Sequence, residues 1–99
     1  MMKLEWSPDA LDDLDGIWNT IAEDNVSKAV SFVEEIRDRA QDLLIAPKSG
    51  IMVPEIGKEE LRELHFKKYT IVYEIRKESI LIHEVFHQRR IHIRSYRRL

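Results

Sequence analysis

Hydrophobic residues near the start of the chain follow a strand-like and then a helix-like spacing. The stretch KLEW at 3–6 alternates polar and apolar residues and is a short strand candidate. SPDA follows and is typical of a helix start, with Ser7 as the N-cap and Pro8 at the first helical position. From Ala10 to Ile21 apolar residues return every three or four positions, which predicts an amphipathic helix.

A second segment with the same spacing follows a short break. EDN at 23–25 interrupts the pattern, and apolar residues resume from about Ser27 to Leu44. APKSG ends this helix because Pro47 cannot continue it, and 47–58 is expected to be a loop. Two helices joined by so few residues are expected to form an antiparallel hairpin.

The last third of the chain changes to the composition of strands. LRELHF at 61–66, YTIVYEIR at 69–76 and SILIHEVF at 79–86 are rich in β-branched and aromatic residues. Polar breaks at 67–68 and 77–78 separate them. These intervals predict a meander of three antiparallel strands.

The order of elements predicts one α+β domain over residues 1–99. It has a short N-terminal strand, an antiparallel helix hairpin on one face of the sheet, and a three-stranded antiparallel meander as that sheet. A basic C-terminal tail follows. Six aromatic residues are assigned to the core by their positions: Trp6, Trp18, Phe32, Tyr69, Tyr73 and Phe86.

Composition narrows the class of protein. The chain has 99 residues and no cysteine, which excludes disulfides and thiolate metal sites. No segment approaches the roughly 20 apolar residues of a membrane span, and the first ten residues lack the apolar core of a signal peptide. We expect a soluble cytoplasmic domain without a membrane partner, a metal or a cofactor.

Charge is distributed unevenly around a net value of −2. Residues 1–49 hold five Lys/Arg against eleven Asp/Glu, whereas 50–99 hold eleven against seven. The last eleven residues, RRIHIRSYRRL, carry five arginines and no acid. This split indicates a basic working end for an acidic or phosphate-bearing partner, or else a solvated tail.

HEVFH at 83–87 matches the H-E-x-x-H pattern of zinc metalloproteases. That chemistry needs both histidines on one helix face, where positions i and i+4 reach the same metal. The segment is predicted to be a strand, on which His83 and His87 would lie about 13 Å apart. No acidic residue after Glu84 offers a third ligand. We therefore treat the match as a coincidence.

In this order, four stretches together resemble the RelE/ParE superfamily, the toxins of bacterial type II toxin–antitoxin pairs. They are WSPDALDDLDGIWNTI, LLIAPKSG, LRELHFKKYTIVYEI and ILIHEVFHQRRI, and their arrangement is most similar to the ParE-like, plasmid-stabilisation branch. The resemblance implies a growth-inhibiting toxin that binds DNA gyrase and is neutralised by a cognate antitoxin. RelE-like relatives imply an alternative, a metal-independent, ribosome-dependent mRNA endoribonuclease. An inactive binding module of the same fold is a third interpretation.

The resemblance also implies candidate site residues. If the chain is a ribonuclease, the catalytic candidates are Arg62, His87, Arg89 and Tyr96, while Thr70 stands where the RelE-like branch has an arginine. That substitution and the acidic net charge favour gyrase over the ribosome and mRNA as the target. The target-binding candidates are the basic residues at this end of the chain: Lys67, Lys68, Arg89, Arg90, Arg94, Arg97 and Arg98.

Several of these residues also have a purely structural interpretation. Arg62 could pair with Glu63 or Glu74 on the sheet, and His65 and His83 are expected to be strand residues with local partners. The C-terminal segment could extend the last strand, form a helix, or face the antitoxin. An antitoxin in this family wraps its toxin with an amphipathic segment, so we expect the groove beside the hairpin to be covered in a hetero-oligomer.

Overall fold

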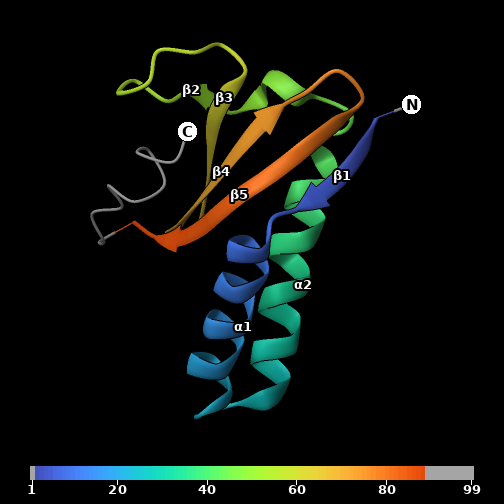
Figure 1. Ribbon diagram of the computed structural model, residues 1–99. Coiled ribbons are helices and arrows are strands. Elements are labelled where there is room, and N and C mark those ends of the chain that lie inside the picture. Colours follow the sequence, from blue (N-terminus) through green and yellow to red (C-terminus); the bar gives the residue numbers. More distant parts are fainter. Residues whose placement is uncertain (1, 89–99) are drawn as a thin grey trace.

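The chain folds as two helices and a five-stranded sheet (Figure 1). The structure is a computed structural model, and it describes residues 2–88. Both helices begin and end within two residues of the predicted positions, and the three predicted C-terminal strands are all present. The elements are β1 (Lys3–Trp6), α1 (Pro8–Ala22), α2 (Val26–Asp42), the 3-10 helix η1 (Pro47–Ser49), β2 (Ile51–Met52), β3 (Leu61–Phe66), β4 (Tyr69–Ile75) and β5 (Ser79–His87).

Side-chain caps fix both helix starts. Ser7 Oγ accepts a hydrogen bond from the Ala10 backbone N–H at 3.0 Å and donates one to the His83 carbonyl at 2.9 Å, which ties α1 to β5. Asn25 Oδ1 accepts from the Lys28 N–H at 3.0 Å, so α2 begins one residue before the predicted Ser27. The predicted N-cap at Ser7 is confirmed.

The sheet has the order β1-β5-β4-β3-β2, so the prediction of a three-stranded sheet is wrong in its strand number. The β3-β4-β5 meander is antiparallel as expected, but β1 joins it by pairing parallel with Ser79–Ile82 of β5. The predicted loop 47–58 contains η1 and β2, and β2 pairs with β3. Alternation of polar and apolar residues indicates that β1 is a strand but does not show which strand it pairs with. The two residues of β2 are too few to show any period.

The hairpin packs on one face of the sheet and forms the main core (Figure 1). Tyr73 is buried in this core. Three other aromatic residues pack against the core while remaining partly exposed: Trp6, Phe32 and Tyr69. Phe86 is buried in a smaller cluster on the opposite face, and Trp18 is half-buried. The prediction that these aromatic residues belong to the core holds fully for Tyr73 and Phe86 and in part for the others.

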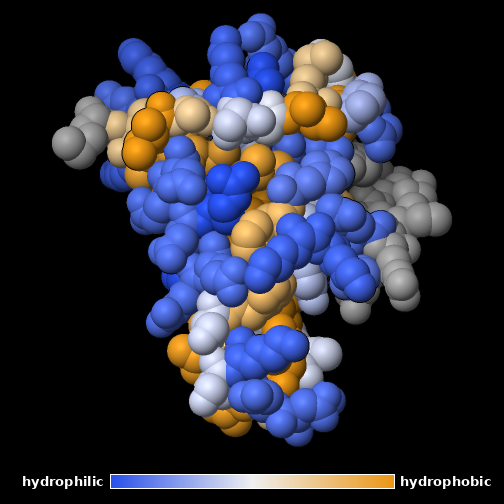
Figure 2. All heavy atoms as spheres, turned by 180° about the vertical axis from the view of Figure 1, so that it is seen from behind, coloured by the Kyte–Doolittle hydropathy of each residue, from blue (hydrophilic) through white to orange (hydrophobic). Residues whose placement is uncertain are grey.

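The closed end of the hairpin extends beyond the sheet (Figure 1). Val26 is 55% exposed and Val30 43% exposed near this tip. Figure 2 shows apolar side chains at the tip and at the upper end of the molecule. Among residues 2–88, no helix has the length and apolar character needed to cross a bilayer.

Candidate functional site

The turn between β3 and β4 forms the basic end of the described structure. Lys67 adopts a positive φ of 54° in this two-residue turn, and Lys68 is exposed. The backbone N–H of Gln88 donates to the Lys68 carbonyl at 2.8 Å. The Gln88 side chain also lies 3.1 Å from His65 Nδ1 and reaches the carbonyls of Lys67 and Tyr69. The end of β5 is therefore fixed beside both lysines.

Lys67 is occupied by contacts with the hairpin. Its Nζ lies 2.8 Å from Glu35 Oε2 on α2 and 5.4 Å from the ring centroids of Phe32 and Phe66. Both partners of the ion pair are about half exposed, so solvent screening keeps its contribution to stability small. Of the two turn lysines, Lys68 is the one whose ammonium is more available to a partner.

A spacing of four residues would place His83 and His87 on one face of a regular strand, but the register shift opposite Val72 and Tyr73 puts them on opposite faces of β5. His87 is beside Tyr69 on the hairpin side, with ring centroids 5.2 Å apart at 77°. His83 faces the other way, and its Nε2 lies 2.8 Å from Glu74 Oε1. Within residues 2–88, no cluster of three potential metal ligands occurs. HEVFH lies on a strand, as predicted, so the helix that an H-E-x-x-H zinc site needs is not formed there.

The local partners expected for His65 and His83 are also present. His65 Nε2 lies 3.3 Å from Glu63 Oε1. Burial tends to raise the pKa of Glu74, but the hydrogen bonds from His83 and Arg76 outweigh it and hold that pKa below its usual value. These two histidines are tied into acid–base pairs on the sheet.

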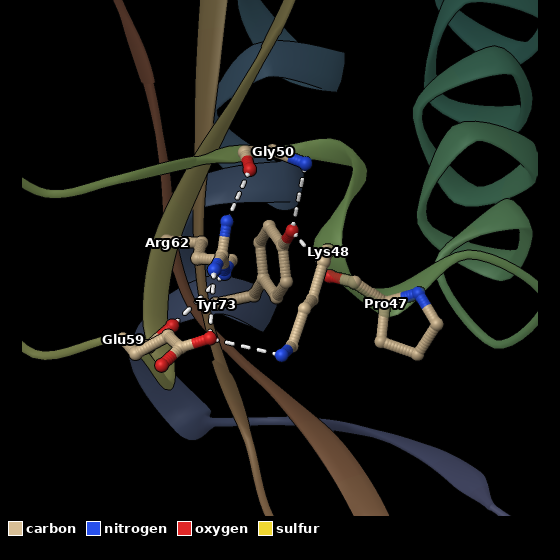
Figure 3. A network of polar contacts seen from close by, with 6 residues as sticks. All are labelled: Pro47, Lys48, Gly50, Glu59, Arg62 and Tyr73. Carbon is tan, nitrogen blue, oxygen red and sulfur yellow. Dashed lines mark hydrogen bonds and ion pairs between the residues drawn. The ribbon is translucent and has the colours of Figure 1, made fainter.

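Arg62 joins the loop before β3 to the sheet rather than pairing with Glu63 or Glu74 (Figure 3). Its Nη1 donates to the Gly50 carbonyl at 2.8 Å, and its Nε donates to the Glu59 carbonyl at 2.9 Å. Glu59 Oε1 lies 3.8 Å from Arg62 Nη2 and 2.9 Å from Lys48 Nζ. The hydrogen bond and the charge of Lys48, helped by Arg62, lower the pKa of Glu59.

Tyr73 completes this network from β4, and sequence reasoning missed its role. Its hydroxyl donates to the Pro47 carbonyl at 2.7 Å and accepts from the Gly50 N–H at 3.0 Å. Burial raises the pKa of the phenol, and the Gly50 hydrogen bond opposes the rise. A Cβ on Gly50 would lie 2.6 Å from both the Glu63 carbonyl and the Tyr73 hydroxyl. The sequence did single out these positions, because the stretches that carry the family resemblance contain all four residues of this contact: Pro47, Gly50, Glu63 and Tyr73.

The candidate catalytic residues within the described part of the chain are not brought together. Arg62 pairs in register with Tyr73, whereas His87 pairs with Tyr69, four residues further back on β4. That separation is about 13 Å along the strand. The remaining candidates lie outside the described residues: Arg89, Arg90, Arg94, Tyr96, Arg97 and Arg98.

A groove of about 460 Å³ runs between α1 and the ends of β4 and β5. Its floor is apolar, with Ile17 and Val85, and its helical wall carries Asp12 and Asp13. Asp13 Oδ2 accepts a hydrogen bond from the Val85 N–H at 2.9 Å, which fixes α1 against the edge of β5. The other lining residues are Gly16, Thr20, Tyr69, Phe86 and His87.

A family model and one solved structure agree with this architecture. The family model described as "ParE toxin of type II toxin-antitoxin system, parDE" matches residues 4–92. A solved structure of the chromosomal ParDE TA system from P. aeruginosa superimposes with a TM-score of 0.73 at 22% identity, covering 88% of this chain and 96% of that one. The conserved hypothetical protein HP0894 from Helicobacter pylori gives a TM-score of 0.47 at 19% identity, covering 90% and 97%. No curated protein matches the chain. The chain belongs to the ParE toxin family of type II toxin–antitoxin systems.

Proposed function

We propose that this chain inhibits bacterial growth by binding DNA gyrase through its basic end. The observation that carries the proposal is the bond from the Gln88 N–H to the Lys68 carbonyl at 2.8 Å. Gln88, which directly precedes the segment with five arginines in the sequence, is therefore held beside the exposed Lys68. A concentrated positive charge of this kind favours capture of an acidic or phosphate-bearing surface.

The described residues support binding rather than RNA cleavage. Metal-independent cleavage needs a base, an acid and cations around one phosphate. Thr70, which replaces the arginine of the RelE-like branch, is 3% exposed. Arg62 is committed to the Gly50 and Glu59 carbonyls, at the opposite end of β3 from His87. The catalytic residues of a ribonuclease site would therefore have to come almost entirely from the chain after residue 88.

Two reactions with the purified protein test this proposal. We expect it to inhibit gyrase-catalysed supercoiling while leaving mRNA intact in a purified translation reaction. New mRNA ends that require ribosomes would contradict gyrase binding and support the endoribonuclease alternative. No effect in either reaction, together with normal growth on strong expression, would support the inactive binding module.

We further propose that the cognate antitoxin covers the groove between α1 and β5. Membership of a toxin–antitoxin family implies such a partner. The groove offers an apolar floor and two aspartates, and the nearby hairpin tip exposes Val26 and Val30. An amphipathic segment with apolar and basic side chains would complement this surface.

Substitutions on α1 test where the antitoxin binds. A Cβ added at Gly16 meets nothing within 4 Å, so Gly16→Arg fills the groove without disturbing the fold. We expect G16R to weaken antitoxin binding while leaving gyrase inhibition unchanged. Asn19→Arg is the matched control, because Asn19 is exposed on the same helix and does not line the groove. Equal antitoxin affinity for both variants would place the antitoxin elsewhere.

A further inference from the structure

Three side chains beside the β3–β4 turn form a cation-binding site that the chain fills with its own Lys67. The carboxylate of Glu35 on α2 lies 2.8 Å from the Lys67 ammonium, and the ring centroids of Phe32 and Phe66 each lie 5.4 Å from it. A ring attracts a cation within roughly 6 Å of its centroid, so both rings contribute. We call Glu35, Phe32 and Phe66 the cation site, and Lys67 shows that a side-chain cation fits it.

The cation site is open to solvent. The side chain of Glu35 is 46% exposed and that of Lys67 is 53% exposed, and both phenylalanines are partly exposed. Water and salt screen an exposed ion pair of this kind, so it contributes little to stability. Lys67 is therefore held loosely, and its flexible side chain can leave the site while the backbone of the turn stays in place.

An arginine side chain would bind the cation site more tightly than the resident lysine does. Its planar guanidinium can donate two hydrogen bonds to the Glu35 carboxylate and can stack on an aromatic ring. The ammonium of Lys67 is a compact, strongly hydrated charge that cannot make this flat contact. The chemistry of the site thus favours an arginine from a partner over the side chain that fills it in the free chain.

A row of aromatic rings connects the cation site with the groove between α1 and β5. The ring centroids of Phe66 and Phe32 lie 6.1 Å apart, those of Phe32 and Tyr69 5.4 Å, and those of Tyr69 and His87 5.2 Å. Tyr69 and His87 also line the groove. A polypeptide segment that lies in the groove therefore needs only a few further extended residues to reach the cation site.

We propose that the cognate antitoxin places an arginine side chain in the cation site and displaces Lys67. This proposal rests on the antitoxin binding at the groove, and it adds the side chain that the antitoxin uses at the end of that groove. The acidic residues Asp12 and Asp13 in the groove, and Glu35 in the cation site, favour a basic segment. Lys67 then competes with the antitoxin, so removing its ammonium should strengthen the complex.

Isothermal titration calorimetry of the full chain with the purified cognate antitoxin tests the displacement. Lys67→Gly removes the competing ammonium, and glycine suits the φ of 54° at this position, so the turn is kept. We expect K67G to bind the antitoxin about three- to tenfold more tightly than the wild type. Lys67→Asn also tolerates a positive φ and should show the same gain. Lys77→Gly, in the exposed turn between β4 and β5, is the matched control and should bind like the wild type.

A defined probe tests the cation site without the antitoxin. N-acetylarginine amide, titrated into the full chain, should shift the NMR signals of the Phe32 and Phe66 ring protons, and K67G should bind it more tightly than the wild type. The citrulline analogue has the same shape but no charge, so it should leave these signals in place. The double variant K67G/E35Q should lose both the response to the probe and the gain in antitoxin affinity, because it lacks the Glu35 carboxylate.

The proposal is overturned if K67G and K67N bind the antitoxin no more tightly than the wild type, which would make Lys67 a structural support or a direct antitoxin contact. It is also overturned if the gain persists in K67G/E35Q, or if the citrulline analogue acts like the arginine probe. G16R separates this proposal from that of the groove. Unchanged antitoxin affinity in G16R, with a gain in K67G, would contradict binding at the groove and still support the cation site.

Discussion

The hydroxyl of Tyr73 binds both a donor and an acceptor from the loop that leaves the hairpin. Gly50 lies so close to it that a single methyl group would collide with the Tyr73 hydroxyl and the Glu63 carbonyl. Arg62 then holds the Gly50 carbonyl and the Glu59 backbone (Figure 3). Residues quoted for the family resemblance thus have a structural role, which is to fix this loop to the sheet.

Tyr73→Phe should destabilise the protein by about 1–3 kcal/mol, because it leaves the Gly50 N–H and the Pro47 carbonyl without their partner in a buried site. Urea denaturation followed by circular dichroism measures the change. Tyr69→Phe is the control, because Tyr69 is on the same strand but partly exposed, and it should lower the free energy of unfolding by less. Equal losses for the two variants would contradict a special role for the Tyr73 hydroxyl.

The Glu74–His83 pair should make stability depend on pH in the acidic range. The folded-state pKa of Glu74 lies below its usual value of 4.5, so its contribution is present above that value and is lost as pH falls through the folded pKa. Urea midpoints of the wild type and Glu74→Gln, measured from pH 6 downwards, should therefore converge in acid. A constant difference between the two at every pH would show that Glu74 does not act through its charge.

At the scale of elements, periodicity predicted both helices, while β-branched and aromatic composition with short polar breaks predicted the three strands of the meander. Neither signal could predict that β1 pairs in parallel with β5, because that pairing depends on how the helix hairpin places the later strands beside β1. Neither signal indicated β2, because its two residues form a strand only by pairing with β3. Arg62 was a catalytic candidate because of the family resemblance, and its contacts with Gly50 and Glu59 were not predicted because those residues stand in a stretch without a regular pattern.

Replacing glycine by alanine should raise the stability of the protein at one position and lower it at another. Gly16 lies inside α1 with open space around it, so Gly16→Ala should stabilise the protein by about 0.5–1 kcal/mol. Gly57 has a φ of +71°, so Gly57→Ala should cost about 1–2 kcal/mol from backbone strain. Thermal unfolding of both variants measures the pair, and a shift in the same direction for both would contradict these assignments.

At the scale of the whole molecule, we propose that the antitoxin and the target bind two neighbouring surfaces, because the groove residues Tyr69 and His87 lie directly beside the Lys67–Lys68 turn. The acidic helix α1 borders the groove proposed for the antitoxin, and the turn with Lys67 and Lys68 begins the basic end proposed for the target. The charge asymmetry of the sequence predicted a basic working end and an acidic scaffold. It could not show that Lys67 is held by Glu35, because that contact joins residues 32 positions apart.

Inhibition of gyrase supercoiling by variants of the basic end tests the central claim most directly. Lys68→Glu combined with Arg89→Gln and Arg90→Gln should raise the inhibitory concentration about tenfold or more, a loss of at least roughly 1.4 kcal/mol in binding. Lys77→Glu, an exposed lysine at the opposite end of the sheet, is the matched control and should inhibit like the wild type. Equal inhibition by the triple variant, or no inhibition by the wild type, would contradict gyrase binding through the basic end.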